Sequence, residues 1–168
     1  TYTVTLRVDD ADGGSGSDTL VMTVNNVAPT VNAGVDLVGN EGSLVVFNGS
    51  ATDPGADPLT FTWAFGDGET VSGISLTQPT HIFRQNGNYT VTLTVDDGDG
   101  GVVIDTLAIR INNVAPAIVP VQTEYTGSEG QEITLAVRTF DPGADTLRVR
   151  WDFRDGVTEE GDGLTEVS

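Results

Sequence analysis

The sequence predicts an all-β protein built from tandem β-sandwich repeats. The first observation is an internal repeat: residues 53–68 return as residues 141–156, so Trp63 and Trp151 occupy equivalent places 88 positions apart. A fixed period of this size is typical of a repeat array. The second observation is that short alternating segments are separated by turns rich in Gly, Asp and Asn, and no segment has a helical period,.

The chain begins with a predicted β-hairpin. Residues 2–8 alternate between apolar and polar side chains, which predicts a half-buried antiparallel strand,. Residues 9–17 are typical of a turn, and residues 20–24 resume the alternation,. A lone two-stranded hairpin is marginal in water. We therefore expect this sequence to be cut from a longer run of repeats. The alternative is that neighbouring copies complete each other through strand complementation and form a filament.

The middle of the chain holds one complete repeat of about seven short strands. The strands are expected at residues 31–38, 44–48, 59–65, once or twice within 71–83, and at 89–95 and 103–111. Glycine-rich turns are expected between them, at residues 39–42, 66–69 and 84–88,. This number and spacing of strands is typical of a β-sandwich.

Two similar pentads, residues 25–29 and 112–116, mark the predicted boundaries. Each reads Asn-Asn-Val-Ala-Pro. Proline donates no backbone hydrogen bond and biases its predecessor to an extended conformation, so we interpret the pentads as stiff joints. They divide the chain into residues 1–28, the last hairpin of a preceding repeat, residues 29–115, a complete repeat, and residues 116–168, the N-terminal part of a following repeat.

The composition excludes several classes of partner and chemistry. Seven Lys and Arg against 25 Asp and Glu give a formal charge of −18, which disfavours nucleic acid and anionic membranes as partners. No apolar run is long enough for direct membrane insertion. With no cysteine, disulfides and thiolate sites are excluded,. Such one-signed charge destabilises a compact chain unless cations neutralise it, which favours calcium as a cofactor.

Four motifs of the middle repeat resemble those of a known family. They are Trp-Ala-Phe-Gly-Asp-Gly at 63–68, Pro-Thr-His at 79–81, Gly-Asn-Tyr-Thr-Val-Thr-Leu-Thr-Val-Asp-Asp at 87–97 and Asn-Val-Ala-Pro at 113–116. With these the chain resembles the PKD (polycystic kidney disease) repeat. The resemblance implies an immunoglobulin-like β-sandwich, found in tandem in secreted and cell-surface proteins. The chain departs from the family pattern at Ala64, which replaces the usual Asp, and at Arg154, which replaces a usual Gly. Because Ala64 has no carboxylate, the one turn hydrogen bond that the usual Asp would make is not expected here.

In that topology, acidic and amide side chains gather at both joints. The first expected cluster consists of Asn25, Asn26, Asp53, Asp57, Asp96, Asp97 and Asp99. The second consists of Asn112, Asn113, Glu41, Asp141 and Asp145, with Asp67 as a further candidate. Calcium prefers six to eight such oxygen ligands, and the arrangement also resembles, more loosely, the calcium joints of cadherin repeats. The alternative is that Asp and Asn simply cap turns, to which we assign Asp12, Asp18 and Asp105.

The remaining candidate residues favour structural roles. Trp63 and Trp151 lie in alternating strands, so we expect them in the core and not as sugar platforms. His81, the only histidine, has no Ser or Cys partner in a suitable context, so it is expected to pack beside a strand and the chain is not expected to be an enzyme,. Asn48 and Asn88 fit the N-glycosylation sequon.

The function expected from these observations is structural. The chain is interpreted as a segment of a large extracellular or cell-surface protein, a stalk or fibre stiffened by calcium at its joints, whose partners are the neighbouring repeats of the same chain. The alternative is a carbohydrate- or protein-binding accessory module of a secreted hydrolase.

Overall fold

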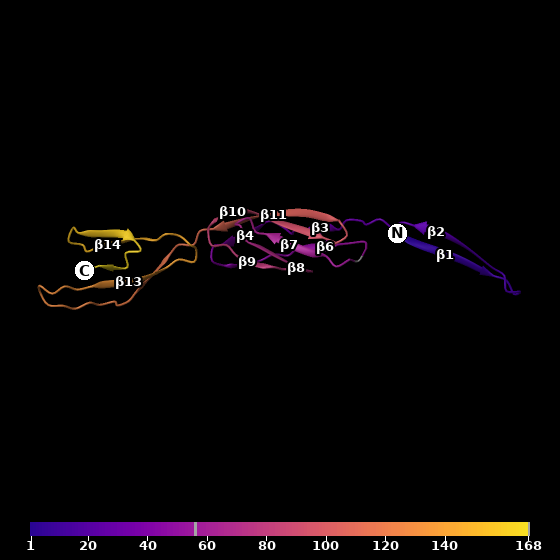
Figure 1. Cartoon of the computed structure of the whole chain (residues 1–168). Coiled ribbons are helices and arrows are strands. Elements are labelled where there is room, and N and C mark those ends of the chain that lie inside the picture. The colour runs from indigo at the N-terminus through magenta and orange to yellow at the C-terminus, as the bar shows by residue number, and fades with distance from the viewer. Residues whose placement is uncertain (56, 168) are drawn as a thin grey trace.

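The computed structural model describes residues 1–55 and 57–167. Ala56, in the predicted 53–58 loop, and Ser168, the last residue of the third predicted segment, lie outside the described residues. The described residues form strands and turns without any helix, which confirms the all-β prediction and leaves no helix that could cross a membrane. A hairpin, a sandwich and a smaller third part follow one another in a row (Figure 1).

The N-terminal hairpin pairs β1 (Tyr2–Asp9) with β2 (Ser15–Met22) in antiparallel register. The strands are where the alternation predicts them, but the expected half-burial is wrong, because every residue of both strands is exposed. Tyr2 and Leu6 of the apolar face are 60% and 66% exposed. A two-stranded ribbon has no second layer of its own, and no other described strand covers this one.

The central part is a two-layer β-sandwich of the immunoglobulin type. Its strands are β3 (Thr30–Asn32), β4 (Leu37–Asn40), β5 (Leu44–Val46), β6 (Ser50–Thr52), β7 (Thr60–Ala64), β8 (Thr70–Ile74), β9 (Thr80–Ile82), β10 (Gly87–Asp96) and β11 (Val102–Asn112). One layer is the five-stranded sheet β4-β11-β10-β7-β8. The opposite layer contains the pairs β3-β6 and β5-β9.

Two predicted strands of the central part differ in the structure: one is divided and the other is shorter. The segment 31–38 begins in β3 of one layer and ends in β4 of the other layer. There β4 runs parallel to β11. Gly34, at φ 104°, permits this crossing, since a Cβ there would lie 2.9 Å from a backbone carbonyl oxygen. Asp105, assigned above to turns, instead lies in β11 and accepts a hydrogen bond from the Ala33 amide at 2.8 Å. The segment 44–48 ends early, and the unpredicted β6 follows it.

The core of the sandwich is aromatic at its centre. Trp63, Phe47 and Phe83 are fully buried, and the Phe47 ring lies 5.8 Å from that of Trp63 and 5.3 Å from that of Phe65. The indole Nε1 of Trp63 donates to the Leu76 carbonyl at 2.9 Å, so burial leaves this polar group paired,. The core position expected for Trp63 is therefore confirmed.

The third part contains a three-stranded sheet and a separate pair. Its strands are β12 (Ala117–Pro120), β13 (Leu135–Phe140), β14 (Arg148–Asp152), β15 (Thr158–Asp162) and β16 (Glu166–Val167). The order is β12-β13-β16, with β14 paired to β15. Trp151 donates to the Leu164 carbonyl at 3.1 Å, thirteen residues further along the chain. Trp63 makes the equivalent bond to Leu76 with the same spacing, but Trp151 is only half-buried. The division at residues 28/29 and 115/116 stays a prediction.

Candidate functional site

At the C-terminal joint, residues 112–116, Glu41 connects the central sandwich to the linking chain. Its amide donates to the Asn112 carbonyl at 3.1 Å, and its carboxylate Oε1 accepts the Val114 amide at 2.6 Å. The residue is completely buried, and Oε2 has no hydrogen-bond partner among the described residues. A fully buried carboxylate with one unpaired oxygen is energetically unfavourable without a further partner.

Two aspartates of the third part lie against Glu41. Asp141 and Asp145 belong to the loop between β13 and β14, and one carboxylate oxygen from each, with one of Glu41, all lie within 4.8 Å of one another. Asp141 Oδ1 accepts the Gly143 amide at 2.8 Å, which shapes the loop. The Ala144 amide donates to the Arg84 carbonyl at 2.7 Å and so fixes the loop to the central sandwich.

The rest of the predicted second cluster is divided. Asn113 lines a surface hollow together with Asp141 and Asp145. Asn112 donates from Nδ2 to Asn40 Oδ1 at 3.3 Å. Asp67 does not reach the joint but turns to His81. The structure thus brings Asp141 and Asp145 beside Glu41, places Asn113 in the hollow that the two aspartates line, and leaves Asp67 out.

The N-terminal joint, residues 25–29, is held by a different contact. Asn26 Nδ2 donates to Asp97 Oδ2 at 2.7 Å, while Asp97 Oδ1 accepts the Gly101 amide at 2.8 Å and the Asp99 amide at 2.9 Å. Asp97 is 3% exposed. The bond from Asn26, with these backbone amides, outweighs burial and lowers the pKa of Asp97,. Asp97 is therefore a fully partnered, charged group.

Three further aspartates surround that contact. Asp53 Oδ1 accepts the Gly55 amide at 2.6 Å, and Asp53 Oδ2 is buried without a partner among the described residues. Burial, together with the negative charges of Asp99, Asp53 and Asp97, raises the pKa of Asp57,. The carboxylates of the 53–57 loop and of the β10–β11 turn therefore interact electrostatically.

The remaining members of the first cluster differ in position. Asn25 and Asn26 line a hollow that Asp57 and Asp99 also line. Asp96 is exposed and accepts only the amide two residues ahead, at 2.8 Å, as an ordinary turn residue does,. Asp96 points away from this cluster because it is the last residue of β10, and successive side chains of a strand face opposite sides of the sheet,.

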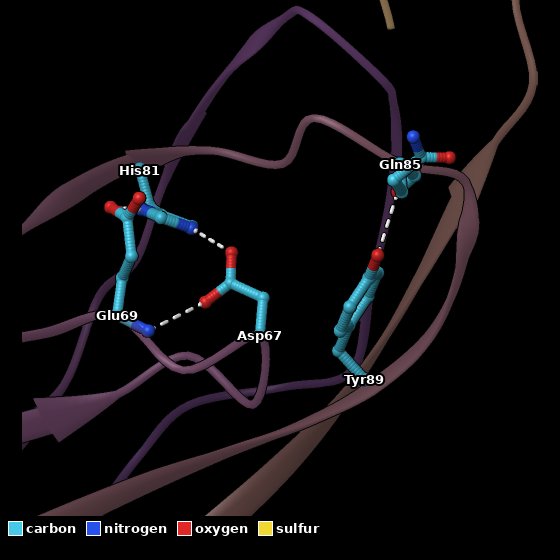
Figure 2. Close-up of polar contacts among 5 residues, drawn as sticks. All are labelled: Asp67, Glu69, His81, Gln85 and Tyr89. Carbon is cyan, nitrogen blue, oxygen red and sulfur yellow. Dashed lines mark hydrogen bonds and ion pairs between the residues drawn. The ribbon is translucent and has the colours of Figure 1, made fainter. Parts of the chain in front are cut away.

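A part-buried polar contact that sequence reasoning missed joins His81 of β9 to Asp67 of the turn between β7 and β8. His81 Nε2 and Asp67 Oδ2 are 2.6 Å apart (Figure 2). The His81 ring also stacks on Phe65, with the ring centroids 4.1 Å apart. Asp67 also accepts the Glu69 amide at 3.1 Å. Partial burial raises the pKa of Asp67, but the bonds from His81 and Glu69 outweigh it and lower the pKa,. His81 packs in the core as expected, but it does so as a member of β9 and not beside a strand.

The two sequon asparagines are the last candidate residues, and Tyr89, which the sequence did not single out, lies near Asp67. The Tyr89 hydroxyl donates to the Gln85 carbonyl at 2.8 Å, next to the buried pair (Figure 2). Asn48 and Asn88 are both exposed, and Asn48 Oδ1 accepts from Gln78 Nε2 at 3.1 Å. Their glycosylation stays a prediction.

A protein-family model described as PKD domain matches residues 26–111, just over half of the chain. Among curated proteins, the chain is 28% identical over 137 residues to Chitinase A of Pseudoalteromonas piscicida, covering 76% of this chain and 16% of the chitinase. It is 30% identical over 122 residues to the microbial collagenase of Vibrio alginolyticus, and 23% identical over 146 residues to Pre-pro-metalloprotease PrtV of Vibrio cholerae. These alignments cover 67% and 87% of this chain but 15% of each relative.

Solved structures with partial similarity include two PKD domains. The crystal structure of the PKD1 domain of Vibrio anguillarum Epp has a TM-score of 0.43 at 26% identity, covering 52% of this chain and 96% of that domain. The PKD domain of an M14-like peptidase from a Thermoplasmatales archaeon has a TM-score of 0.42 at 23% identity, covering 52% and 98%.

Proposed function

Because the chain belongs to the PKD domain family, we propose that it is a non-catalytic extracellular module, an accessory segment of a larger secreted hydrolase. The observation that carries this proposal is the nature of the curated relatives. They are named as a chitinase, a collagenase and a metalloprotease, and the chain corresponds to only 15–16% of each. A segment shared by enzymes with such different substrates is better suited to positioning a catalytic domain than to catalysis.

The described side chains support this proposal. His81 is 7% exposed and its ring stacks on Phe65 in the core, so a substrate cannot reach it. The joint carboxylates lie in turns, where they accept backbone amides. Trp63 is fully buried and its indole is occupied by Leu76, so it offers no platform for a sugar ring.

The experiment uses the chain itself, incubated with insoluble chitin and with collagen fibrils. The expected result is that no hydrolysis product forms with either polymer. Release of soluble products would contradict the non-catalytic assignment. Co-sedimentation of the chain with one polymer would assign it substrate binding, and its absence with both would assign it a spacing role.

A stiff stalk is the second candidate, and the joint contacts favour it. The C-terminal joint is crossed by the bonds from Val114 to Glu41 and from Ala144 to Arg84, and the N-terminal joint carries the bond from Asn26 to Asp97. Such contacts restrict how neighbouring parts turn against one another. Small-angle X-ray scattering tests this: a rod keeps one maximum dimension from low to high salt, whereas a flexible chain contracts as salt screens its charge.

A further inference from the structure

We propose that the C-terminal joint is a calcium site, in which Glu41 of the central sandwich and Asp141 and Asp145 of the third part hold one ion between them. This proposal does not depend on whether the chain is an accessory module or a stalk. It places the ion across the joint, so the ligands come from both the central sandwich and the third part.

The first argument is the buried, unpaired oxygen of Glu41. Oε1 is fixed by the Val114 amide at 2.6 Å, while Oε2 is enclosed with no donor among the described residues. The residue is 0% exposed, so water in bulk does not solvate this oxygen. A fixed, buried carboxylate oxygen that receives no hydrogen bond needs another favourable partner. A bound cation is suited to this role, because an ionised carboxylate has only acceptor oxygens.

The second argument is the distance between the three carboxylates. Their nearest oxygens all lie within 4.8 Å of one another. Two oxygens bound to one calcium ion, at about 2.3–2.6 Å each, are at most about 5 Å apart. None of the three makes an ion pair with a described Arg or His side chain. The carboxylates therefore repel one another at a separation that a bridging ion would make favourable.

The third argument is the glycine that lets the carboxylates meet. A Cβ on Gly143 would lie 2.8 Å from Glu41 Cδ, 2.9 Å from Glu41 Oε2 and 3.1 Å from Asp141 Oδ1. Any larger residue would therefore enter the space between the two acidic side chains. The loop approaches the buried glutamate closely because this position has no side chain.

The ligand chemistry selects calcium. The available groups are carboxylates and the nearby Asn113, which shares the hollow with Asp141 and Asp145, so all are oxygen donors. Magnesium demands a small, regular octahedral shell, whereas calcium accepts more oxygens in irregular arrangements, including bidentate carboxylates. The hollow lined by Asp141 and Asp145 leaves room for water to complete the shell.

The test is isothermal titration of the whole chain, freed of metal by chelation, with calcium chloride in physiological salt. We expect calcium to bind and Glu41→Gln, which keeps the shape but removes the charge, to weaken one binding event by about tenfold or more, as loss of even indirect metal partners commonly does. The matched control is Glu129→Gln, which removes the same charge from the exposed equivalent position in the third part and should leave the affinity unchanged.

A second variant separates the loss of a ligand from the loss of charge. Gly143→Ala keeps all three carboxylates but fills the space between them, and we expect it to weaken calcium binding as Glu41→Gln does. In the unaltered chain, an NMR titration with calcium should shift the amide signals of Val114, Gly143 and Ala144 most. Absence of calcium binding, shifts confined to the N-terminal joint, or equal affinity in Glu41→Gln would overturn the proposal.

Discussion

Replacing Asp67 by Asn tests whether the buried pair with His81 stabilises the sandwich through charge. Asn has the same size, and its oxygen can still accept the Glu69 amide, but the charge opposite His81 Nε2 is lost. The Asp67 side chain is 20% exposed and that of His81 6%, so solvent screens the pair weakly. A charged hydrogen bond contributes about 1.5–3 kcal/mol and a neutral one about 0.5–1.5. The expected loss is therefore about 1 kcal/mol, or roughly 4–8 °C in melting temperature.

The assay is thermal unfolding followed by tryptophan fluorescence. The measurement is made in a Trp151→Phe background, so that Trp63, in the same core as Phe65 and His81, is the only reporter. Glu69→Gln is the control, because Glu69 is 70% exposed and 3.8 Å from the ring of His81. It should change stability by less than about 0.5 kcal/mol.

The pH dependence of the stability difference between the parent chain and Asp67→Asn tests the same electrostatic account. The pKa of Asp67 is lowered in the folded state from its ordinary value of 3.8. The contribution of its charge is therefore fully present above pH 3.8 and is lost as the pH falls through the lower, folded-state pKa. The difference between the parent chain and Asp67→Asn should thus shrink on acidification below that value. An equal difference at pH 7 and at pH 2.5 would refute the electrostatic account.

Three other predictions follow from described contacts. Gly49→Ala should destabilise the sandwich by about 1–3 kcal/mol in urea unfolding, because its Cβ would lie 2.6 Å from the buried ring of Trp63,; the control Gly73→Ala, whose Cβ meets only ordinary contacts of 3.5 Å, should be close to neutral. Tyr89→Phe should cost about 1 kcal/mol through its lost hydroxyl bond, and an unchanged urea midpoint would contradict this,. We also propose that copies associate through the uncovered hairpin face, so sedimentation velocity should show concentration-dependent association that Leu6→Asp abolishes,.

The sequence was sufficient for the class of fold and for most strands. Strict alternation predicted β10 and β11 to within a residue or two, because each buries one face against the same core,. It was not sufficient where the chain changes layers. The segment 31–38 alternates as one strand would, and only the approach of Gly34 to the opposite backbone reveals that it divides into β3 and β4.

The candidate site was predictable in part for the same reason. The internal repeat placed Asp53 and Asp141 in equivalent loops, and the topology carried those loops to the joints. Which carboxylate becomes buried depends on the packing between parts, so the unpaired oxygen of Glu41 was visible only in the structure. The pairing of Asp67 with His81 was missed because the two residues lie on different segments and no local spacing connects them.

The parallel pairing of β4 with β11 determines how the module would respond to mechanical tension. β4 lies near the start of the central sandwich and β11 at its end, and residues 37–40 pair with residues 109–112. Pulling on the two joints would slide these strands along each other, so that their hydrogen bonds share the load and must break together. In the antiparallel β1–β2 hairpin, whose first and last residues lie side by side, a pull between Thr1 and the first joint would open the bonds one at a time. Under force we therefore expect the hairpin to open first and the sandwich to hold, with a high rupture peak in single-molecule pulling.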